Sequence, residues 1–262
     1  MKAERFARIL RKILAEPKSI RLYARACRER VYRRFLAGKL IYTNGKNNTK
    51  ATVIYAPGQT EPVYSPFNAG IARHLASLGY RTIRFDFKRT KDKTSMMLDD
   101  SSIEAFCSQL IALASAESRR AGAPIILMGK SFGGAIASKV ADRIPALGCI
   151  AIGYPFFNPA SKWSRTQHLS SIQKRLIIIQ GTADDHGTPL QVKELELSPL
   201  IEIRWIQNAD HGFKCSLLRE KDIDKYNELL QACGDACKSI LEAQNMTFSQ
   251  HAQQQSLASG IF

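Results

Sequence analysis

The chain has 262 residues, of which 45% are hydrophobic, and a formal net charge of +15 at pH 7. This length is enough to bury one sizeable core, so we expect a single domain with short appendages. Every apolar run is shorter than the ~20 residues of a membrane-spanning helix, and the charged start has no signal-peptide core. These features exclude a membrane-spanning class and favour a soluble cytoplasmic protein, with organellar targeting by the basic N-terminus left open.

Most of the positive charge lies at the start of the chain. The first forty residues contain thirteen Lys or Arg and three Glu, which gives this segment a net charge of +10. Apolar residues recur there at helical spacing, first around Ile9 and again after Pro17 as far as Leu36. We therefore expect a basic amphipathic helical arm over residues 1–39. It suits an anionic membrane surface, a nucleic acid or an acidic protein partner, or equally two helices packed on the domain with a basic outer face.

Residues 40–244 alternate between strand-like and helix-like patterns. The expected strands cover residues 40–42, 51–56, 82–87, 125–128, 149–154, 176–180 and 201–206, and the expected helices residues 68–78, 101–119, 135–140 and 217–241. This alternation predicts an α/β fold, with a mainly parallel sheet and helices on both faces. The polar residues 245–262 predict a frayed C-terminal tail.

A serine stands at the turn between one expected strand and its helix. The turn has the sequence GKSFGG over residues 129–134. Its small residues allow the strand and the helix to approach closely, and the serine hydroxyl lies at the positive end of the helix. Small residues also occur in ordinary strand-to-helix turns, so the pattern needs a downstream acid and base to support it. Ser131 is the candidate nucleophile.

The candidate acid follows the expected strand 176–180. In parallel sheets, functional side chains collect beyond the C-terminal ends of the strands. Residues 143–183 contain neither Asp nor Glu, so the first available carboxylates are those of Asp184 and Asp185. Asp184 is preferred because it lies closer to the end of the strand, and Asp185 is the alternative.

The candidate base follows the expected strand 201–206. His211 stands a few residues beyond the end of this strand. His186 competes for the role, but it lies so close to the acid in sequence that simultaneous bonds to the acid and the serine are awkward. We therefore expect the order Ser131, Asp184, His211.

These residue types suggest a division of labour. His211 would accept the proton of Ser131 and later protonate the leaving group, while Asp184 would orient the imidazole ring. The main-chain N–H groups of Phe132 and Gln59 are the candidate oxyanion donors. For Gln59, a simple turn that closes the preceding strand is the alternative.

The six cysteines are scattered and form no C-x-x-C pair. Reduced thiols in the core are the expected state, although Cys233 and Cys237 are one helical turn apart and would also suit a redox pair. We expect neither a metal nor a cofactor.

These segments resemble those of the α/β-hydrolase fold superfamily. The chain is most similar to its small, lidless dienelactone hydrolase-like branch, which includes testis-expressed protein 30 and the hydrolase-like domain of a histone acetyltransferase complex regulatory subunit. The resemblance rests on residues 84–87, 129–134, 181–189 and 209–213 and covers about residues 50 to 240. It implies the fold and a Ser-Asp-His triad. The chain departs from the family at Pro57-Gly58, where His-Gly is usual, and at Lys88-Arg89, where Pro-Tyr is usual.

Three residues are candidate substrate contacts. Lys130 would favour an anionic substrate, whereas Phe156 and Trp163 would line the acyl side. Solvation of the lysine and core packing of the phenylalanine are the alternatives. Residues 155–174 leave little room for a lid, which favours an open cleft and a small acyl group.

We expect a serine hydrolase that cleaves a carboxylic ester or thioester through an acyl-enzyme on Ser131. Acyl transfer to an acceptor other than water would use the same residues. The alternative is a catalytically weak, hydrolase-like interaction module whose arm, residues 1–39, binds an acidic partner, a membrane or a nucleic acid. The sequence does not define the oligomeric state.

Overall fold

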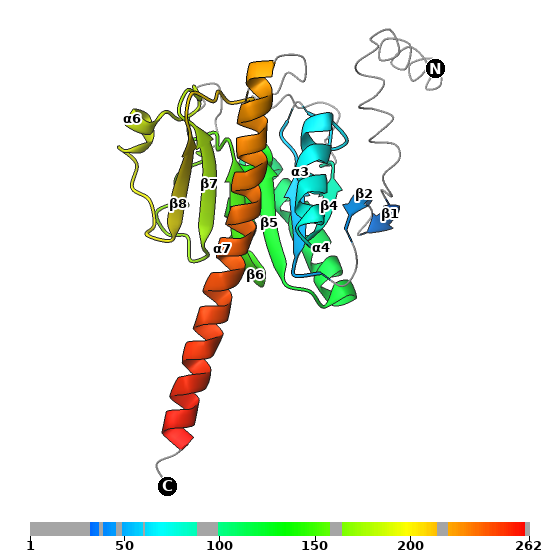
Figure 1. The fold of residues 1–262 in the computed structure, drawn as a ribbon, viewed down its shortest axis with the longest axis vertical. Coiled ribbons are helices and arrows are strands. Elements are labelled where there is room, and N and C mark those ends of the chain that lie inside the picture. Colours follow the sequence, from blue (N-terminus) through cyan, green and yellow to red (C-terminus); the bar gives the residue numbers. More distant parts are fainter. Residues whose placement is uncertain are drawn as a thin grey trace.

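The structure, a computed structural model, describes residues 32–36, 39–45, 49–59, 61–87, 99–157, 164–213 and 220–259. Residues 1–31 of the expected arm lie outside these ranges, as does Trp163. The described strands form one eight-stranded sheet with helices on both faces, which is the expected α/β architecture (Figure 1).

The elements follow one another in an alternating order. The strands are β1 (Tyr32–Leu36), β2 (Lys39–Asn44), β3 (Thr52–Ala56), β4 (Arg81–Phe85), β5 (Ile125–Lys130), β6 (Ala146–Ile152), β7 (Leu176–Gly181) and β8 (Ile201–Ile206). The helices are α3 (Pro66–Ser77), α4 (Asp100–Ala121), α5 (Phe132–Val140), the short 3₁₀ helix η2 (Ala141–Arg143), α6 (Pro189–Val192) and α7 (Glu220–Ser259).

The strand order in the sheet is β1-β2-β4-β3-β5-β6-β7-β8. β2 pairs antiparallel with both β1 and β4, and the pairings from β4 through to β8 are parallel. The C-terminal ends of β3, β5, β6, β7 and β8 therefore lie along the same edge of the sheet.

Each face of the sheet supports a separate hydrophobic core. Leu127 of β5 packs into the core shared with α4 and α5, whereas its neighbours Ile126 and Met128 pack into the core shared with α3 and α7. Because side chains alternate between faces and both faces are covered, this strand is buried along its whole length. The continuous apolar runs in the sequence arise from this double coverage.

The first strand corrects one expectation. Residues 32–36 were expected to be helical, but Tyr32–Leu36 pairs antiparallel with β2 and forms the edge of the sheet. The sheet thus begins eight residues before the expected domain start at residue 40, and β2 is an interior strand. Aromatic residues at positions 32 and 35 suit a strand as well as a helix, and the pairing with β2 selects the strand.

The C-terminal segment corrects another. α7 continues to Ser259, so residues 245–259 are helical rather than frayed. Residues 241–259 contain neither Gly nor Pro and are rich in Gln and Ala, and Gly260 follows the last helical residue. The second half of α7 extends beyond the sheet (Figure 1). Among the described residues, no helix combines the length and the hydropathy needed to cross a membrane.

The four described cysteines are buried free thiols, namely Cys107, Cys149, Cys233 and Cys237. Burial raises the pKa of the Cys107 thiol to about 11 and also raises the pKa of Cys233 and of Cys237. The expectation that the cysteines lie in the core is confirmed for these four residues.

A buried ion pair ties α4 to the sheet. Arg81 of β4 contacts Glu117 of α4, and their side chains are only 2% and 0% exposed. Arg120 adds two hydrogen bonds to the same carboxylate, of 2.7 and 3.0 Å. Removing one member of such a group leaves an uncompensated charge away from water.

We therefore predict that Glu117→Gln lowers the free energy of unfolding by about 3–5 kcal/mol, because Arg81 stays buried without its counter-charge. Glu104→Gln is the matched control, since Glu104 pairs with Arg143 on the surface and is half exposed. The control should lose no more than about 1 kcal/mol. Urea unfolding of both variants measures the difference, and equal small losses would contradict the prediction.

Candidate active site

Ser131 occupies a strained turn between β5 and α5. Its φ is +49°, in the left-handed region, which costs a non-glycine residue about 1–3 kcal/mol. The turn closes tightly, because a β-carbon on Gly129 would collide with the main chain of Gly133. The Ser131 N–H donates to the Ile152 carbonyl over 2.8 Å, which holds the turn against β6. The sequence places the serine here because glycine alone fits the crowded positions around it.

Asp184 lies in the loop that follows β7. Its side chain is fully buried, and one carboxylate oxygen accepts the His186 main-chain N–H over 2.9 Å. The other oxygen accepts the side-chain amide of Gln180 over 2.9 Å. These two bonds hold the carboxylate in place independently of His211.

The loop that follows β8 carries His211 and is joined to the acid loop. The Ala183 N–H donates to the Ala209 carbonyl over 3.0 Å, and the Asn208 N–H donates to the Thr182 hydroxyl over 2.8 Å. Asn208 has a positive φ of 58°, as this tight turn requires. The two loops are therefore positioned as a unit.

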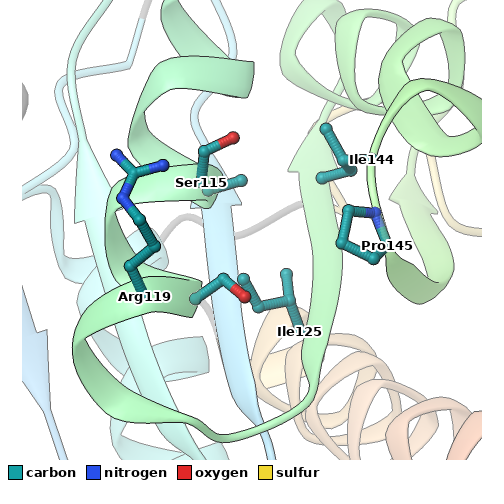
Figure 2. A pocket seen from close by; sticks show the side chains of 7 residues that line it. Ser115, Arg119, Ile125, Ile144 and Pro145 are labelled. Atoms are coloured by element: carbon teal, nitrogen blue, oxygen red, sulfur yellow. The ribbon is translucent and has the colours of Figure 1, made fainter.

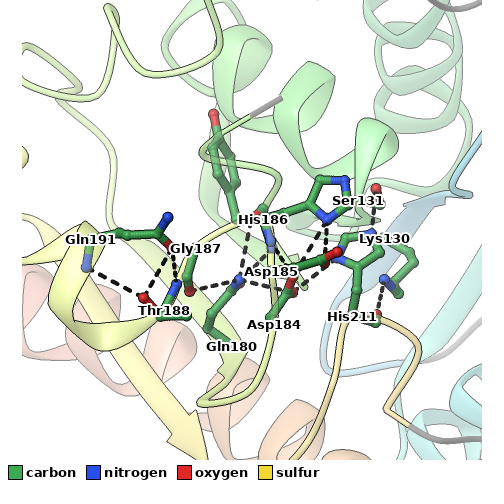
Figure 3. A network of polar contacts seen from close by, with 11 residues as sticks. Lys130, Ser131, Gln180, Asp184, Asp185, His186, Gly187, Thr188, Gln191 and His211 are labelled. Carbon is green, nitrogen blue, oxygen red and sulfur yellow. Dashed lines mark hydrogen bonds and ion pairs between the residues drawn. The ribbon is translucent and has the colours of Figure 1, made fainter. Parts of the chain in front are cut away.

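The structure brings Ser131, Asp184 and His211 into one hydrogen-bonded line (Figure 3). His211 Nδ1 lies 2.9 Å from Asp184 Oδ2, and His211 Nε2 lies 3.0 Å from Ser131 Oγ. The three residues follow β5, β7 and β8 in the expected chain order. Asp185, the alternative acid, is 84% exposed and contacts His186 instead. Asp184 and His211, rather than Asp185 and His186, are therefore the residues that lie within hydrogen-bond distance in line with Ser131.

His186 lies directly against His211. Its ring stacks on that of His211 with 4.3 Å between centroids and 28° between planes. Its Nδ1 lies 2.8 Å from Asp185 Oδ1 and 3.6 Å from Asp184 Oδ1. His186 thus contacts Asp184, as His211 does, but no described bond joins it to Ser131.

Asp184, His186 and His211 also have potential metal-ligand atoms within 4.8 Å of one another. In the structure these residues take part in hydrogen bonds with one another and with Asp185.

The environment shifts the three ionisable groups in different directions. Burial tends to raise the pKa of Asp184, but hydrogen bonds from His186 and His211 outweigh it and hold the carboxyl below its usual range. Burial lowers the pKa of His211, assisted by the positive charges of Lys130 and His186, although the bond to Asp184 opposes the shift. The bond to Asp184 raises the pKa of His186. His211 is therefore favoured as the neutral imidazole that a base requires.

The residues expected to supply the oxyanion donors lie close to the serine in the fold. Phe132 is the first residue of α5, where main-chain N–H groups point out of the helix end. The loop of Gln59 passes alongside, because a β-carbon on Gly58 would lie 3.7 Å from the β-carbon of Ser131. The placement suits a shared oxyanion site even though Pro57-Gly58 replaces the usual His-Gly.

The expected substrate contacts are placed differently. The side chain of Lys130 is buried, and its Nζ donates to the His211 carbonyl over 2.7 Å, so it does not support the expected contact with an anionic substrate. Phe156 is 4% exposed and packs on Tyr154 with 4.8 Å between ring centroids, which matches the core-packing alternative. Trp163 lies outside the described residues.

Gln180 is the site residue that the sequence did not reveal. It is the penultimate residue of β7 and is fully buried. Its amide donates to Asp184, while its oxygen accepts the Tyr154 N–H over 2.6 Å. A polar residue within an otherwise apolar strand, four positions before the acid, was the available signal.

A separate cavity of about 210 Å³ lies at the other edge of the sheet (Figure 2). It is lined by Ala114, Ser115, Ser118, Arg119, Ile125, Ile144 and Pro145. Ile125 begins β5 and Pro145 directly precedes β6, whereas Ser131 follows the end of β5. The cavity is therefore remote from the triad.

Comparison with known proteins agrees with this fold. Residues 49–241 match the family described as the alpha/beta hydrolase domain. The chain belongs to this family. The match covers the strands from β3 to β8 and the three residues Ser131, Asp184 and His211 of this alpha/beta hydrolase.

Several solved structures resemble this alpha/beta hydrolase, all below 20% sequence identity. An α/β serine hydrolase without a lid from Xanthomonas campestris is 19% identical, with a TM-score of 0.58 over 81% of this chain and 95% of that one. Dienelactone hydrolase from Anabaena variabilis is 17% identical, with a TM-score of 0.59 over 79% and 95%. An α/β serine hydrolase homologue from Coxiella burnetii is 19% identical, with a TM-score of 0.56 over 79% and 96%. At these identities the likeness establishes the fold alone.

The stacked histidines provide a test of the site that does not depend on turnover. We predict that the pKa of His186 lies above the ordinary value of about 6.5 and that of His211 below it. As the pH falls, His186 should therefore take up its proton first. An NMR titration of the imidazole resonances, assigned with His186→Gln and His211→Gln, measures both values. The reverse order would show that the site's electrostatics differ from those described.

Proposed function

We propose that this alpha/beta hydrolase is a serine hydrolase that cleaves a carboxylic ester or thioester. The observation that carries the proposal is the continuous chain of contacts from Asp184 through His211 to Ser131, at 2.9 and 3.0 Å. A serine hydroxyl needs such a base to become an effective nucleophile. The finer likeness to the branch of testis-expressed protein 30 is part of this proposal and rests on sequence resemblance.

In the acylation step, the Ser131 hydroxyl attacks the carbonyl carbon while its proton moves to Nε2 of His211. The main-chain N–H groups of Phe132 and Gln59 donate hydrogen bonds to the substrate oxygen and stabilise its negative charge. Collapse of the intermediate breaks the bond to the leaving oxygen or sulfur, which departs with the proton from His211. Asp184, held by Gln180, stabilises the imidazolium that forms between these events.

In the second step, water gives a proton to His211 and attacks the acyl-enzyme. The acid product leaves, and the proton returns from His211 to Ser131, so the site is restored. An acceptor alcohol or amine in place of water would produce acyl transfer with the same residues.

We predict that a fluorophosphonate probe labels the wild type at a saturating level and that Ser131→Ala abolishes the labelling. Asp184→Asn and His211→Ala should slow it by at least about 10²-fold, because each disables the base. Ser108→Ala, which changes an exposed serine of α4, is the control and should be labelled at the wild-type rate. Mass spectrometry of the labelled peptide identifies the modified serine.

Absence of labelling in a folded wild-type protein would refute the hydrolase proposal. It would favour the interaction module, in which residues 1–39 bind an anionic surface or an acidic partner.

The oxyanion assignment has its own test. Gln59→Pro removes the main-chain N–H and should slow labelling by about 10²- to 10³-fold. Gln59→Ala keeps that N–H and should react at nearly the wild-type rate. Circular dichroism and thermal unfolding show whether both variants are folded. Equal rates in the two folded variants would remove Gln59 from the proposed oxyanion site.

A further inference from the structure

The residue before Ser131 carries a positive charge into the interior. Lys130 is the last residue of β5 and is 6% exposed. Its Nζ lies 2.7 Å from the main-chain oxygen of His211, to which it donates a hydrogen bond (Figure 3). A single side chain thus connects the turn that presents the serine with the loop that presents the base.

The surroundings of this ammonium group are shaped to admit it. Gly153 follows β6 with a φ of +56°, and a β-carbon there would lie 2.8 Å from Lys130 Nζ. On another side, the ring of Phe213 faces the ammonium with 5.6 Å from Nζ to the ring centroid. Any residue larger than glycine at position 153 would displace the ammonium from its place. The space beside Gly153, the His211 oxygen and the Phe213 ring together accommodate the ammonium group.

Stability alone is a weak reason for such a residue. Burying an ammonium group is costly, and a well-packed apolar side chain of similar size is often at least as stable. The ammonium of Lys130 nevertheless donates a charge-assisted hydrogen bond to a main-chain oxygen of the loop that carries His211. The bond to the His211 main chain suggests that the role of Lys130 is to hold His211 in position rather than to fill the core.

We propose that Lys130 is a positioning residue that fixes the His211 loop relative to Ser131. The proposal rests on the hydrolase function proposed above and adds a residue to its machinery. It also replaces the expected role in which this lysine would meet an anionic substrate, since the ammonium is already bound to His211. Small displacements of a base from its nucleophile cost large factors in rate, so the bond has a catalytic consequence.

The charge of Lys130 supplies a second, measurable effect. The charged or titratable groups that face His211 are Asp184 and His186 from the acid loop and Lys130 from β5. The lysine also interacts with Glu61 in the loop after β3. After burial and the bond to Asp184, the positive charge of Lys130 is the next influence on His211, and it lowers the pKa of the imidazole. Removing the charge should therefore raise that pKa and move the acid limb of activity to higher pH.

The test compares Lys130→Met with Lys139→Met, which removes the same charge from a half-buried position on α5. Rates of fluorophosphonate labelling are measured across pH for both variants and the wild type. Lys130→Met should lower the limiting rate by on the order of 10- to 100-fold and shift the acid limb to higher pH. Lys139→Met should match the wild type in both respects. Lys130→Arg, which keeps the charge and a donor, should keep the acid limb of the wild type.

An NMR titration of His211 in Lys130→Met gives a readout that does not require activity. A higher pKa for His211, with a thermal unfolding midpoint that shows a folded protein, supports the proposal. A folded Lys130→Met variant with the wild-type labelling rate and an unchanged His211 titration would overturn it. If the wild type itself is not labelled, the hydrolase function fails, and the NMR comparison still decides whether Lys130 controls His211.

Discussion

The buried carboxylate of Asp184 is the constraint on which the rest of the site depends. A carboxylate with no exposed surface must have its oxygens satisfied by the protein, and Gln180, His186 and His211 do so. Each partner comes from a different position along the chain: the end of β7, the acid loop and the loop after β8. Satisfying one charge therefore fixes the geometry of all three. The orientation of the histidine is a by-product of this requirement.

The sheet makes that convergence possible. Gly181 at the end of β7 is in register with Ile206 at the end of β8, and Lys130 at the end of β5 is in register with Ile152 at the end of β6. Because these parallel strands end in register, the loops that follow them begin at the same edge of the sheet. Ser131 and His211, 80 positions apart in sequence, therefore meet at hydrogen-bond distance. The two cores that cover the sheet keep this edge rigid.

Sequence reasoning recovered what depends on local pattern and chain order. The apolar runs defined seven of the strands. The glycines around Ser131 and the carboxylate-free stretch before Asp184 pointed to two side chains that the structure brings together with His211. Sequence reasoning failed where a distant partner decides the outcome. β1 is a strand because β2 pairs with it, and the ammonium of Lys130 is accommodated in the interior because a main-chain oxygen 81 residues later accepts its hydrogen bond. Neither partner leaves a mark at the residue itself. Gln180 differs from these two cases, because a polar residue within an otherwise apolar strand was visible in the sequence, whereas its bond to Asp184 was not.

The position of β1 determines where the segment that precedes Tyr32 joins the sheet. Tyr32 enters the sheet at one margin, and six strands separate β1 from β8, whose loop carries the base. Whatever precedes Tyr32 is joined to the domain at the margin farthest from the histidine loop. The point at which that leading segment joins the domain and the point at which the His211 loop leaves it are therefore separated by the width of the sheet. Substitutions beside Tyr32 and substitutions beside His211 act on opposite margins of one sheet.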